Sequence, residues 1–252
     1  MQISAVIITF NEERNIGRCL SSLNGVCDEI IVVDSLSTDR TKEICLQYPL
    51  VKFFEQKFLG YSAQKNYANK LASYDNILSI DADEALSEQL KQSIIDIKAL
   101  YDNTNSSGRI FAVKRLTNYC GSWIKHSGWY PDTKQRIFHK SFQWVGEIHE
   151  TLIYPSNVKT QTLKGDLFHY TVYNSSEHIK QIDKFTTLLA KQSLEKGKKA
   201  NGFDLWFRPK WKFFRDYIIN RGFLDGSAGY QVCKMSAFAT FLKYAKIKES
   251  NK

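Results

Sequence analysis

The feature that most constrains this chain is a short apolar run that ends in two carboxylates, within residues 76–84. Residues 77–80 read Ile-Leu-Ser-Ile, and a short run of branched apolar side chains predicts a buried strand. Asp81 and Asp83 follow directly, with Ala82 between them. Side chains two positions apart in an extended chain point the same way, so the two carboxylates would repel each other unless a cation lay beside them. Mg²⁺ or Mn²⁺ is the expected cation, since both bind carboxylates, and Mg²⁺ is commonly shared with substrate phosphates.

The pattern has a structural alternative, because Asp and Ser also mark the start of a helix after a strand. Two further predicted strands, residues 3–9 and 29–34, end at Thr9 and Asp34. Helical segments separate the strands, and this β-α-β-α order predicts a mostly parallel sheet with helices on both faces. The C-terminal ends of such strands share one edge, where open α/β sheets bind ligands. The joint placement of these polar residues favours a site.

The middle of the chain is less regular. Apolar residues at helical spacing predict a helix over residues 86–101, and residues 109–115 read as an edge strand. Residues 117–150 are rich in Gly, Trp, Tyr and His with little periodicity, which is typical of a ligand-contacting region. Glu147, His149 and Glu150 close this region and suit acid/base chemistry or metal binding. A solvated strand edge is the alternative.

Positive charge is concentrated at the C-terminal end of the chain. Residues 196–252 contain 13 Lys and Arg against 4 Asp and Glu, and residues 1–195 contain 22 of each, so the tail carries the whole net charge of +9. Within residues 203–217, large aromatic side chains alternate with cations. This mixture predicts contact with an anionic membrane surface. Packing of the aromatics on the rest of the chain is the competing interpretation.

Cysteine usage and hydropathy indicate the compartment. The five cysteines show no metal-ligand spacing, and an odd count without close pairs is typical of reduced thiols in the cytosol. The N-terminus lacks the basic region of a secretory signal, and no charge-free run reaches the roughly 18 residues of a membrane span. We therefore expect a cytoplasmic protein, bound peripherally to a membrane surface.

Several segments together resemble glycosyltransferase family 2, a family of inverting enzymes with the GT-A fold. Within that family they are most similar to the bacterial lipopolysaccharide core glucosyltransferase branch. No single segment is decisive, but their order and spacing are specific and cover nearly the whole chain. The segments are residues 5–13, 32–39, 60–66, 81–84, 129–138, 149–150 and 213–226.

The resemblance implies roles for individual residues. Thr9, Asn11 and Asp34 would hold the nucleoside, with Asp34 accepting a hydrogen bond from the base. Lys65 stands where the family often has Arg, and it lacks the planar fork of a guanidinium. Asp81 would lie near the ribose and the metal.

The resemblance also implies the chemical groups. Asp83 would be the main metal ligand, with His169 as an additional candidate. Inversion needs one general base for the acceptor hydroxyl, and Glu150 is the first candidate and Glu147 the second. The family often places its base in a Glu-Asp or Asp-Asp pair, which this sequence lacks. Arg136 is a candidate contact for the diphosphate or for an anionic acceptor.

These expectations combine into one interpretation with two alternatives. Residues 1–175 would form an α/β GT-A domain, with a nucleotide-sugar half (1–100) and an acceptor half (101–175), and residues 176–252 a helical membrane-associating region. The enzyme would use Mg²⁺ or Mn²⁺ to move a hexose, glucose by resemblance, from a UDP-sugar to a lipid-linked saccharide such as the lipopolysaccharide inner core. A sugar-phosphate nucleotidyltransferase is one alternative, although the segment after the first strand lacks the glycine-rich basic loop of that class. A basic nucleic-acid-binding module is the other, although it leaves the paired carboxylates unexplained; the main interpretation expects no nucleic-acid partner.

Overall fold

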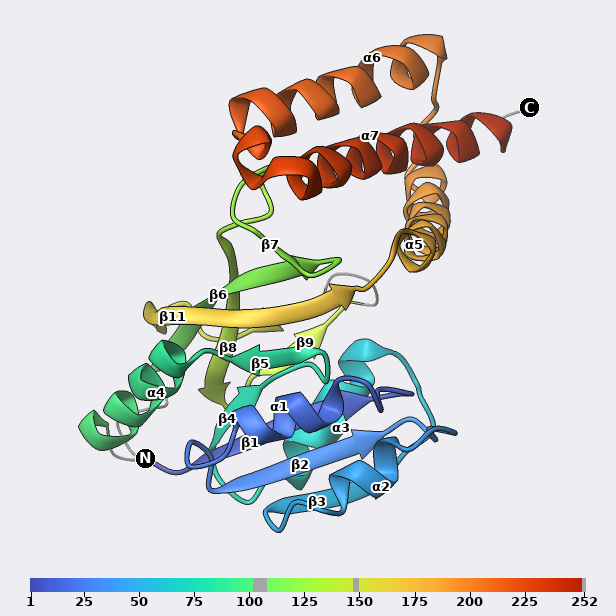
Figure 1. Cartoon of the computed structure of the whole chain (residues 1–252). Coiled ribbons are helices and arrows are strands. Elements are labelled where there is room, and N and C mark those ends of the chain that lie inside the picture. Colours follow the sequence, from blue (N-terminus) through green and yellow to red (C-terminus); the bar gives the residue numbers. More distant parts are fainter. Residues whose placement is uncertain (102–107, 147–149, 251–252) are drawn as a thin grey trace. The chain divides into compact units, whose positions relative to one another are not determined.

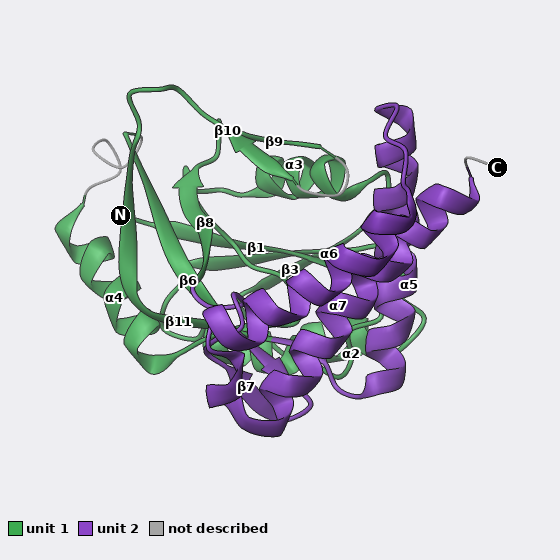
Figure 2. Cartoon of the chain, turned by 90° about the horizontal axis from the view of Figure 1, so that it is seen from above, with its two compact units in different colours: residues 1–115, 132–169 green, residues 116–131, 170–252 purple. Residues whose placement is uncertain are grey.

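A computed structural model describes residues 1–101, 108–146 and 150–250 of the chain. The chain divides into two compact units, which Figure 2 distinguishes by colour. Unit 1 comprises residues 1–115 and 132–169, and unit 2 comprises residues 116–131 and 170–252. The predicted catalytic residues all belong to the sequence ranges of unit 1.

Four parallel strands form the first half of the sheet in unit 1 (Figure 1). Their order is β3 (Val51–Glu55), β2 (Glu29–Asp34), β1 (Ile3–Thr9) and β4 (Asn76–Ser79). Thr9 lies opposite Asp34 in the β1–β2 pair, and Val6 lies opposite Ser79 in the β1–β4 pair. The C-terminal ends of β1, β2 and β4 therefore meet at one edge, as the sequence predicts.

Further strands extend this sheet beyond β4. β8 (Asp132–His139) is antiparallel to β4 and to β6 (Arg109–Tyr119), and β11 (Lys159–Val172) and β5 (Glu84–Leu86) complete the order. The short β7 (Ser122–Ile124) pairs with β6. The α/β class is confirmed, but the prediction of an edge strand at 109–115 is wrong. Because β6 lies between β8 and β11, both of its edges are hydrogen-bonded.

Helices cover both faces of the parallel strands, because alternate strand residues point to opposite sides. One core packs α1 (Ile16–Ser22) and α4 (Glu88–Leu100) against side chains such as Ile7 and Val32. The other core packs α3 (Tyr61–Leu71) and a separate hairpin against side chains such as Val6 and Ile31. The hairpin consists of β9 (Gln143–Val145) and β10 (Thr151–Ile153), and α2 (Thr41–Cys45) connects β2 to β3.

Glu29, the first residue of β2, is a buried carboxylate that ties three segments together. It accepts hydrogen bonds from the Ser4 hydroxyl, from the backbone N–H and hydroxyl of Ser73, and from Lys52 Nζ at 2.7 Å. Burial by itself raises the pKa of Glu29, but these partners outweigh it and lower the pKa to about 2. The ionised form is therefore favoured by folding.

Glu29→Gln is expected to destabilise the chain at pH 7 by up to roughly 3 kcal/mol, the linkage value of this shift. Since the folded pKa lies below the unfolded value near 4.5, the stabilisation is present above pH 4.5 and is lost as the pH falls towards 2. Urea unfolding should show the difference between wild type and variant shrinking between pH 5 and pH 3. The exposed Glu88→Gln serves as the control, and a gap independent of pH would contradict the assignment.

Unit 2 contains three long helices and two short ones. They are α5 (Ser175–Glu195), α6 (Gly202–Phe214), the π-helix η1 (Arg215–Ile219), the 3₁₀-helix η2 (Gly222–Asp225) and α7 (Gly226–Glu249). α7 packs against α5 and α6. A Cβ on Gly229 would lie 2.0 Å from the carbonyl oxygen of Gly222, so only glycine permits this approach of α7 to η2. Among the described residues, no helix has the length and apolar character needed to cross a membrane.

Candidate active site

Three of the predicted nucleoside-binding residues lie at the ends of β1 and β2. Asp34 is buried, and its carboxylate accepts the backbone N–H of Ser37 at 2.7 Å and the Ser37 hydroxyl. Asn11 has φ +54°, in the left-handed region, and its Oδ1 accepts the backbone N–H of Thr38 at 2.8 Å. The hydroxyl of Thr9 is buried without a hydrogen-bond partner among the described residues. Because buried polar groups almost always have hydrogen-bond partners, this hydroxyl is a candidate group for binding a ligand.

Asp81 follows β4 and lies between two cations. Lys65 Nζ, from α3, is 3.3 Å from one carboxylate oxygen of Asp81, and Arg136 Nη2, from β8, is 2.8 Å from the other. Burial would raise the pKa of Asp81, but the charges of Arg136 and Lys65 hold that pKa well below its usual range. The structure thus brings Asp81, Lys65 and Arg136 together, and Asp81 is ionised at any physiological pH.

Arg136 is the buried centre of a larger charge network. Its exposed fraction is 4%, and its Nη2 also contacts Glu84, a fully enclosed carboxylate. Glu84 in turn accepts the backbone N–H of Asp81 at 3.0 Å and lies 3.5 Å from Arg115. Arg136 therefore pairs with two carboxylates, of which Glu84 is fully enclosed and Asp81 is partly exposed. Its contact with a diphosphate or an acceptor stays a prediction. Sequence reasoning missed Glu84, which reads only as the residue after the Asp-Ala-Asp segment.

Arg136→Met is expected to destabilise the protein by up to about 3–5 kcal/mol, because it removes the nearest cation of the buried Glu84 and one of the two cations that pair with Asp81. Adding Glu84→Gln to this variant should recover part of the loss. Urea unfolding measures both effects. Arg40→Met is the matched control, since the Arg40–Glu43 pair is exposed to solvent and contributes little to stability. Equal losses for Arg136→Met and Arg40→Met would contradict the network.

Asp83 and His169 form a separate pair beside Asp81. His169 Nε2, from β11, lies 3.2 Å from Asp83 Oδ2, and the two side chains are 13% and 22% exposed. No group of three or more His, Cys, Asp or Glu side chains in the described parts of the chain is arranged to hold a metal ion by itself. A cation that shares its coordination with a diphosphate needs only one or two protein carboxylates. The Asp83–His169 pair fits that requirement, and Asp81 offers its oxygens only in competition with two cations.

Glu12 is a further carboxylate near this pair that sequence reasoning did not select. Burial raises the pKa of Glu12 to about 7, a hydrogen bond from Asn15 opposes the rise, and the charges of Asp83 and Asp39 add to it. The charges of Asp83 and Asp39 therefore place Glu12 in a negative field. Such a field favours a bound cation.

Helix α3 fixes the hairpin that carries the predicted base. The Asn66 amide donates to the carbonyl of Trp144 at 2.8 Å and accepts the Trp144 N–H at 2.9 Å, as a neighbouring strand would. The Ser62 hydroxyl donates to the carbonyl of Gly146, and Lys65 Nζ lies over the Trp144 ring at 5.1 Å. Glu150 directly precedes β10 and is partly exposed. Glu147 and His149 lie outside the described residues.

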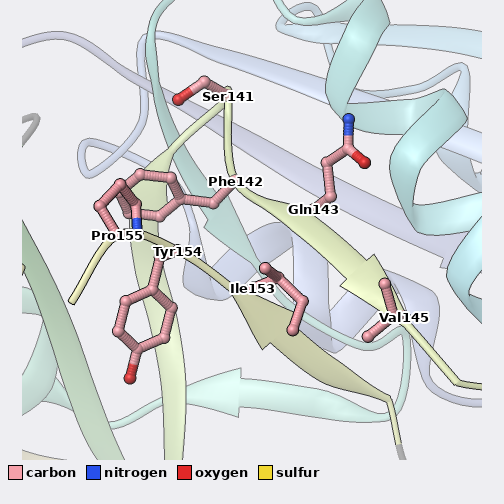
Figure 3. A pocket seen from close by; sticks show the side chains of 7 residues that line it. All are labelled: Ser141, Phe142, Gln143, Val145, Ile153, Tyr154 and Pro155. Carbon is pink, nitrogen blue, oxygen red and sulfur yellow. The ribbon is translucent and has the colours of Figure 1, made fainter.

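A hollow on this hairpin contains none of the predicted site residues (Figure 3). Figure 3 shows Val145 and Ile153 on the two paired strands of the hairpin. The lining residues are Ser141, Phe142, Gln143, Val145, Ile153, Tyr154 and Pro155. We place the candidate site at the charged strand ends instead, because the carboxylates and cations that could bind a metal and an anionic substrate lie there.

Known proteins resemble this chain over most of its length. The sequence profile described as glycosyl transferase family 2 matches residues 4–152. An uncharacterised glycosyltransferase of Rickettsia felis is 32% identical over 99% of this chain and 90% of its own length. The lipopolysaccharide core biosynthesis glycosyltransferase LpsC of Rhizobium meliloti is 30% identical over 98% of this chain and 92% of its own length.

A solved structure shares the fold. Residues 1–349 of TarS from S. aureus, crystallised with UDP-GlcNAc, align with a TM-score of 0.51 and 17% identity, over 100% of this chain and 91% of that chain. The expected GT-A class with additional C-terminal helices is therefore confirmed. With the matched profile and the full-length relatives, these findings establish that the chain is a glycosyltransferase that belongs to glycosyl transferase family 2.

Proposed function

We propose that this glycosyltransferase moves a hexose from a nucleotide sugar to a saccharide acceptor, with inversion at the anomeric carbon. The observation that carries the proposal is the gathering of polar groups at the ends of adjacent parallel strands. Thr9 and Asp34 lie opposite each other in register, and Asp81 and Asp83 follow the neighbouring strand. This edge is where open α/β sheets bind nucleotides.

Each group at this edge has a proposed role. The hydroxyl of Thr9, which has no hydrogen-bond partner in the described parts of the chain, binds the nucleoside together with the Asn11 loop and Asp34. The Asp34 carboxylate keeps lone pairs for a base N–H beside its hydrogen bonds from Ser37. Lys65 and Arg136 orient Asp81 towards the ribose. Asp83, with His169 as an additional ligand, holds Mg²⁺ or Mn²⁺. When bound, this cation neutralises charge on the diphosphate leaving group.

The hairpin loop supplies the proposed base. Glu150 accepts the proton of the acceptor hydroxyl, whose oxygen forms the new bond to the anomeric carbon as the bond to the diphosphate breaks. Glu147 is the second candidate. The two hydrogen bonds between Asn66 and Trp144 support this role, because they hold the hairpin against α3, the helix that also carries Lys65.

The finer identities rest on resemblance and on one relative. We propose UDP-glucose as the donor and a lipid-linked saccharide such as the lipopolysaccharide inner core as the acceptor. The name of the LpsC relative, which matches nearly end to end, supports this class of acceptor. The corresponding location is the cytoplasmic face of a bacterial inner membrane, with the protein bound peripherally.

Calorimetric titration with nucleoside diphosphates tests the donor part of this proposal. UDP should bind more tightly with Mg²⁺ than in the presence of chelator, and more tightly than ADP or GDP under the same conditions. Thr9→Val should weaken binding of UDP while the protein stays folded. UDP affinity that depends neither on the identity of the nucleotide base nor on Mg²⁺ would contradict the proposal.

A further inference from the structure

Helix α6 of unit 2 presents a row of large aromatic side chains to solvent, called here the aromatic ladder: Phe203, Phe207, Trp211 and Phe214. Their exposed fractions are 61%, 41%, 47% and 48%. Successive ring centroids lie 4.9, 6.5 and 5.8 Å apart. α6 packs against α7 and η1, with α7 running alongside it in Figure 1, and the ladder stays uncovered. A contiguous exposed apolar surface of this kind marks an interaction site.

A groove beside the ladder joins apolar walls to two cations. Lys210 Nζ lies 3.7 Å from the ring centroid of Trp206, and Lys234 Nζ lies 4.6 Å from that of Phe213. No carboxylate of the described residues forms an ion pair with either lysine. The residues that line the groove are Leu205, Trp206, Pro209, Lys210, Phe213, Lys234, Ala237, Phe238 and Phe241. Ammonium groups over aromatic rings at an apolar groove suit a ligand with both an anionic and an apolar part.

The charge of this region selects among possible occupants. Residues 196–252 carry a net charge of +9, so a second copy of the chain would meet this face with the same sign of charge. Nucleic acid would satisfy the charge, but bases stack on open aromatic faces. The rings of Phe203, Phe207 and Trp211 are nearly parallel and face one another, at 14° and 5° between successive planes. An anionic lipid surface matches both the charge and the exposed ring edges.

We propose that the aromatic ladder and the adjoining groove are a docking site for an anionic phospholipid bilayer. The ladder rings lie at the depth of the headgroups, and Lys210 and Lys234 bind phosphate oxygens. The docking site would bring the enzyme to a lipid-linked acceptor, and this purpose rests on the proposed function. Its test needs no sugar donor, so failure of either proposal is seen separately.

Flotation with vesicles tests the docking site on the full chain. Wild type should float with phosphatidylcholine–phosphatidylglycerol vesicles, be partly released by salt, and bind pure phosphatidylcholine much more weakly. The double variant Phe207→Gln, Trp211→Gln should lose at least tenfold in vesicle affinity. Its matched control is Leu46→Gln, Leu100→Gln, which removes two apolar side chains of unit 1 that are even more exposed. Brominated acyl chains should quench wild-type tryptophan fluorescence more than that of the Trp211 variant.

A second pair of variants distinguishes the contribution of the groove to vesicle binding from the contribution of net charge. Lys210→Gln, Lys234→Gln should weaken binding about tenfold or more, since each lysine near an anionic leaflet contributes to affinity. Lys198→Gln, Lys248→Gln removes the same charge from exposed positions outside the groove and should have a smaller effect. Equal effects of the two lysine pairs, or full vesicle binding by the ladder variant, would overturn the site. A wild-type dimer that the ladder variant converts to monomers would also overturn the site. RNA binding that depends on the ladder, together with vesicle binding that does not depend on lipid charge, would overturn it as well.

Discussion

Asp83→Asn is expected to reduce sugar transfer by about 100- to 1,000-fold while leaving the fold intact. The substitution keeps the size of the side chain but removes the charge that we assign to metal binding beside His169. A metal at this position supplies several kcal/mol of charge stabilisation in the transition state, and each 1.36 kcal/mol is tenfold in rate. Because the charge of Asp83 raises the pKa of Glu12, replacing the Asp83 carboxylate relieves repulsion and should not unfold the protein.

Asp96→Asn is the matched control, since Asp96 is exposed on α4, away from the sheet edge. Transfer rates should be measured against Mg²⁺ and Mn²⁺ concentration, with urea unfolding alongside. The Asp83 variant should need far more metal, or show no metal dependence at all. Normal transfer by this variant, or full wild-type activity in chelator, would contradict the metal assignment.

Glu150→Gln should reduce transfer by about two to four orders of magnitude, the usual contribution of a general base. Glutamine keeps the shape of the side chain but cannot accept the proton of the acceptor hydroxyl. Binding of the donor should barely change, because Glu150 follows the hairpin loop and the proposed donor groups lie at the strand ends. Single-turnover rates and calorimetric donor affinity measure the two effects separately.

Glu147→Gln is the direct comparison for this prediction. A large loss with Glu147→Gln and a small one with Glu150→Gln would reverse the ranking of the two candidates. If neither variant loses more than tenfold, the base lies elsewhere. A large fall in donor affinity with Glu150→Gln would instead indicate a binding role.

The parallel half of the fold could be read from the sequence because its strands are apolar and short. The run that precedes Asp81 and the runs that precede Thr9 and Asp34 all appear as strands, since both of their faces are buried. The central position of residues 132–139 could not be predicted. Six of its eight residues are polar or charged, and two of these, Arg136 and Asp132, belong to the charge network, so the apolar pattern is hidden.

Prediction from the sequence has the same limit at the candidate site. The Asp-Ala-Asp segment predicts carboxylates at a sheet edge, but it cannot show that Lys65 and Arg136 neutralise Asp81 and leave Asp83 with His169. Those partners come from α3, β8 and β11, up to 86 positions away in the chain. Likewise, nothing in the helical pattern of residues 60–66 indicates that Asn66 acts as a strand-like partner of Trp144.

The central claim is that the edge formed by β1, β2 and β4 binds a nucleotide sugar and that the chain transfers the sugar with inversion. Proton NMR of the glucose released from UDP-glucose in the presence of Mg²⁺ tests this claim most directly, since water can replace the unknown acceptor. Because the glucose of UDP-glucose is α-linked, the β-anomer should appear first, and chelator or Asp83→Asn should abolish its release. Initial release of the α-anomer, or release that ignores both chelator and Asp83→Asn, would contradict the claim.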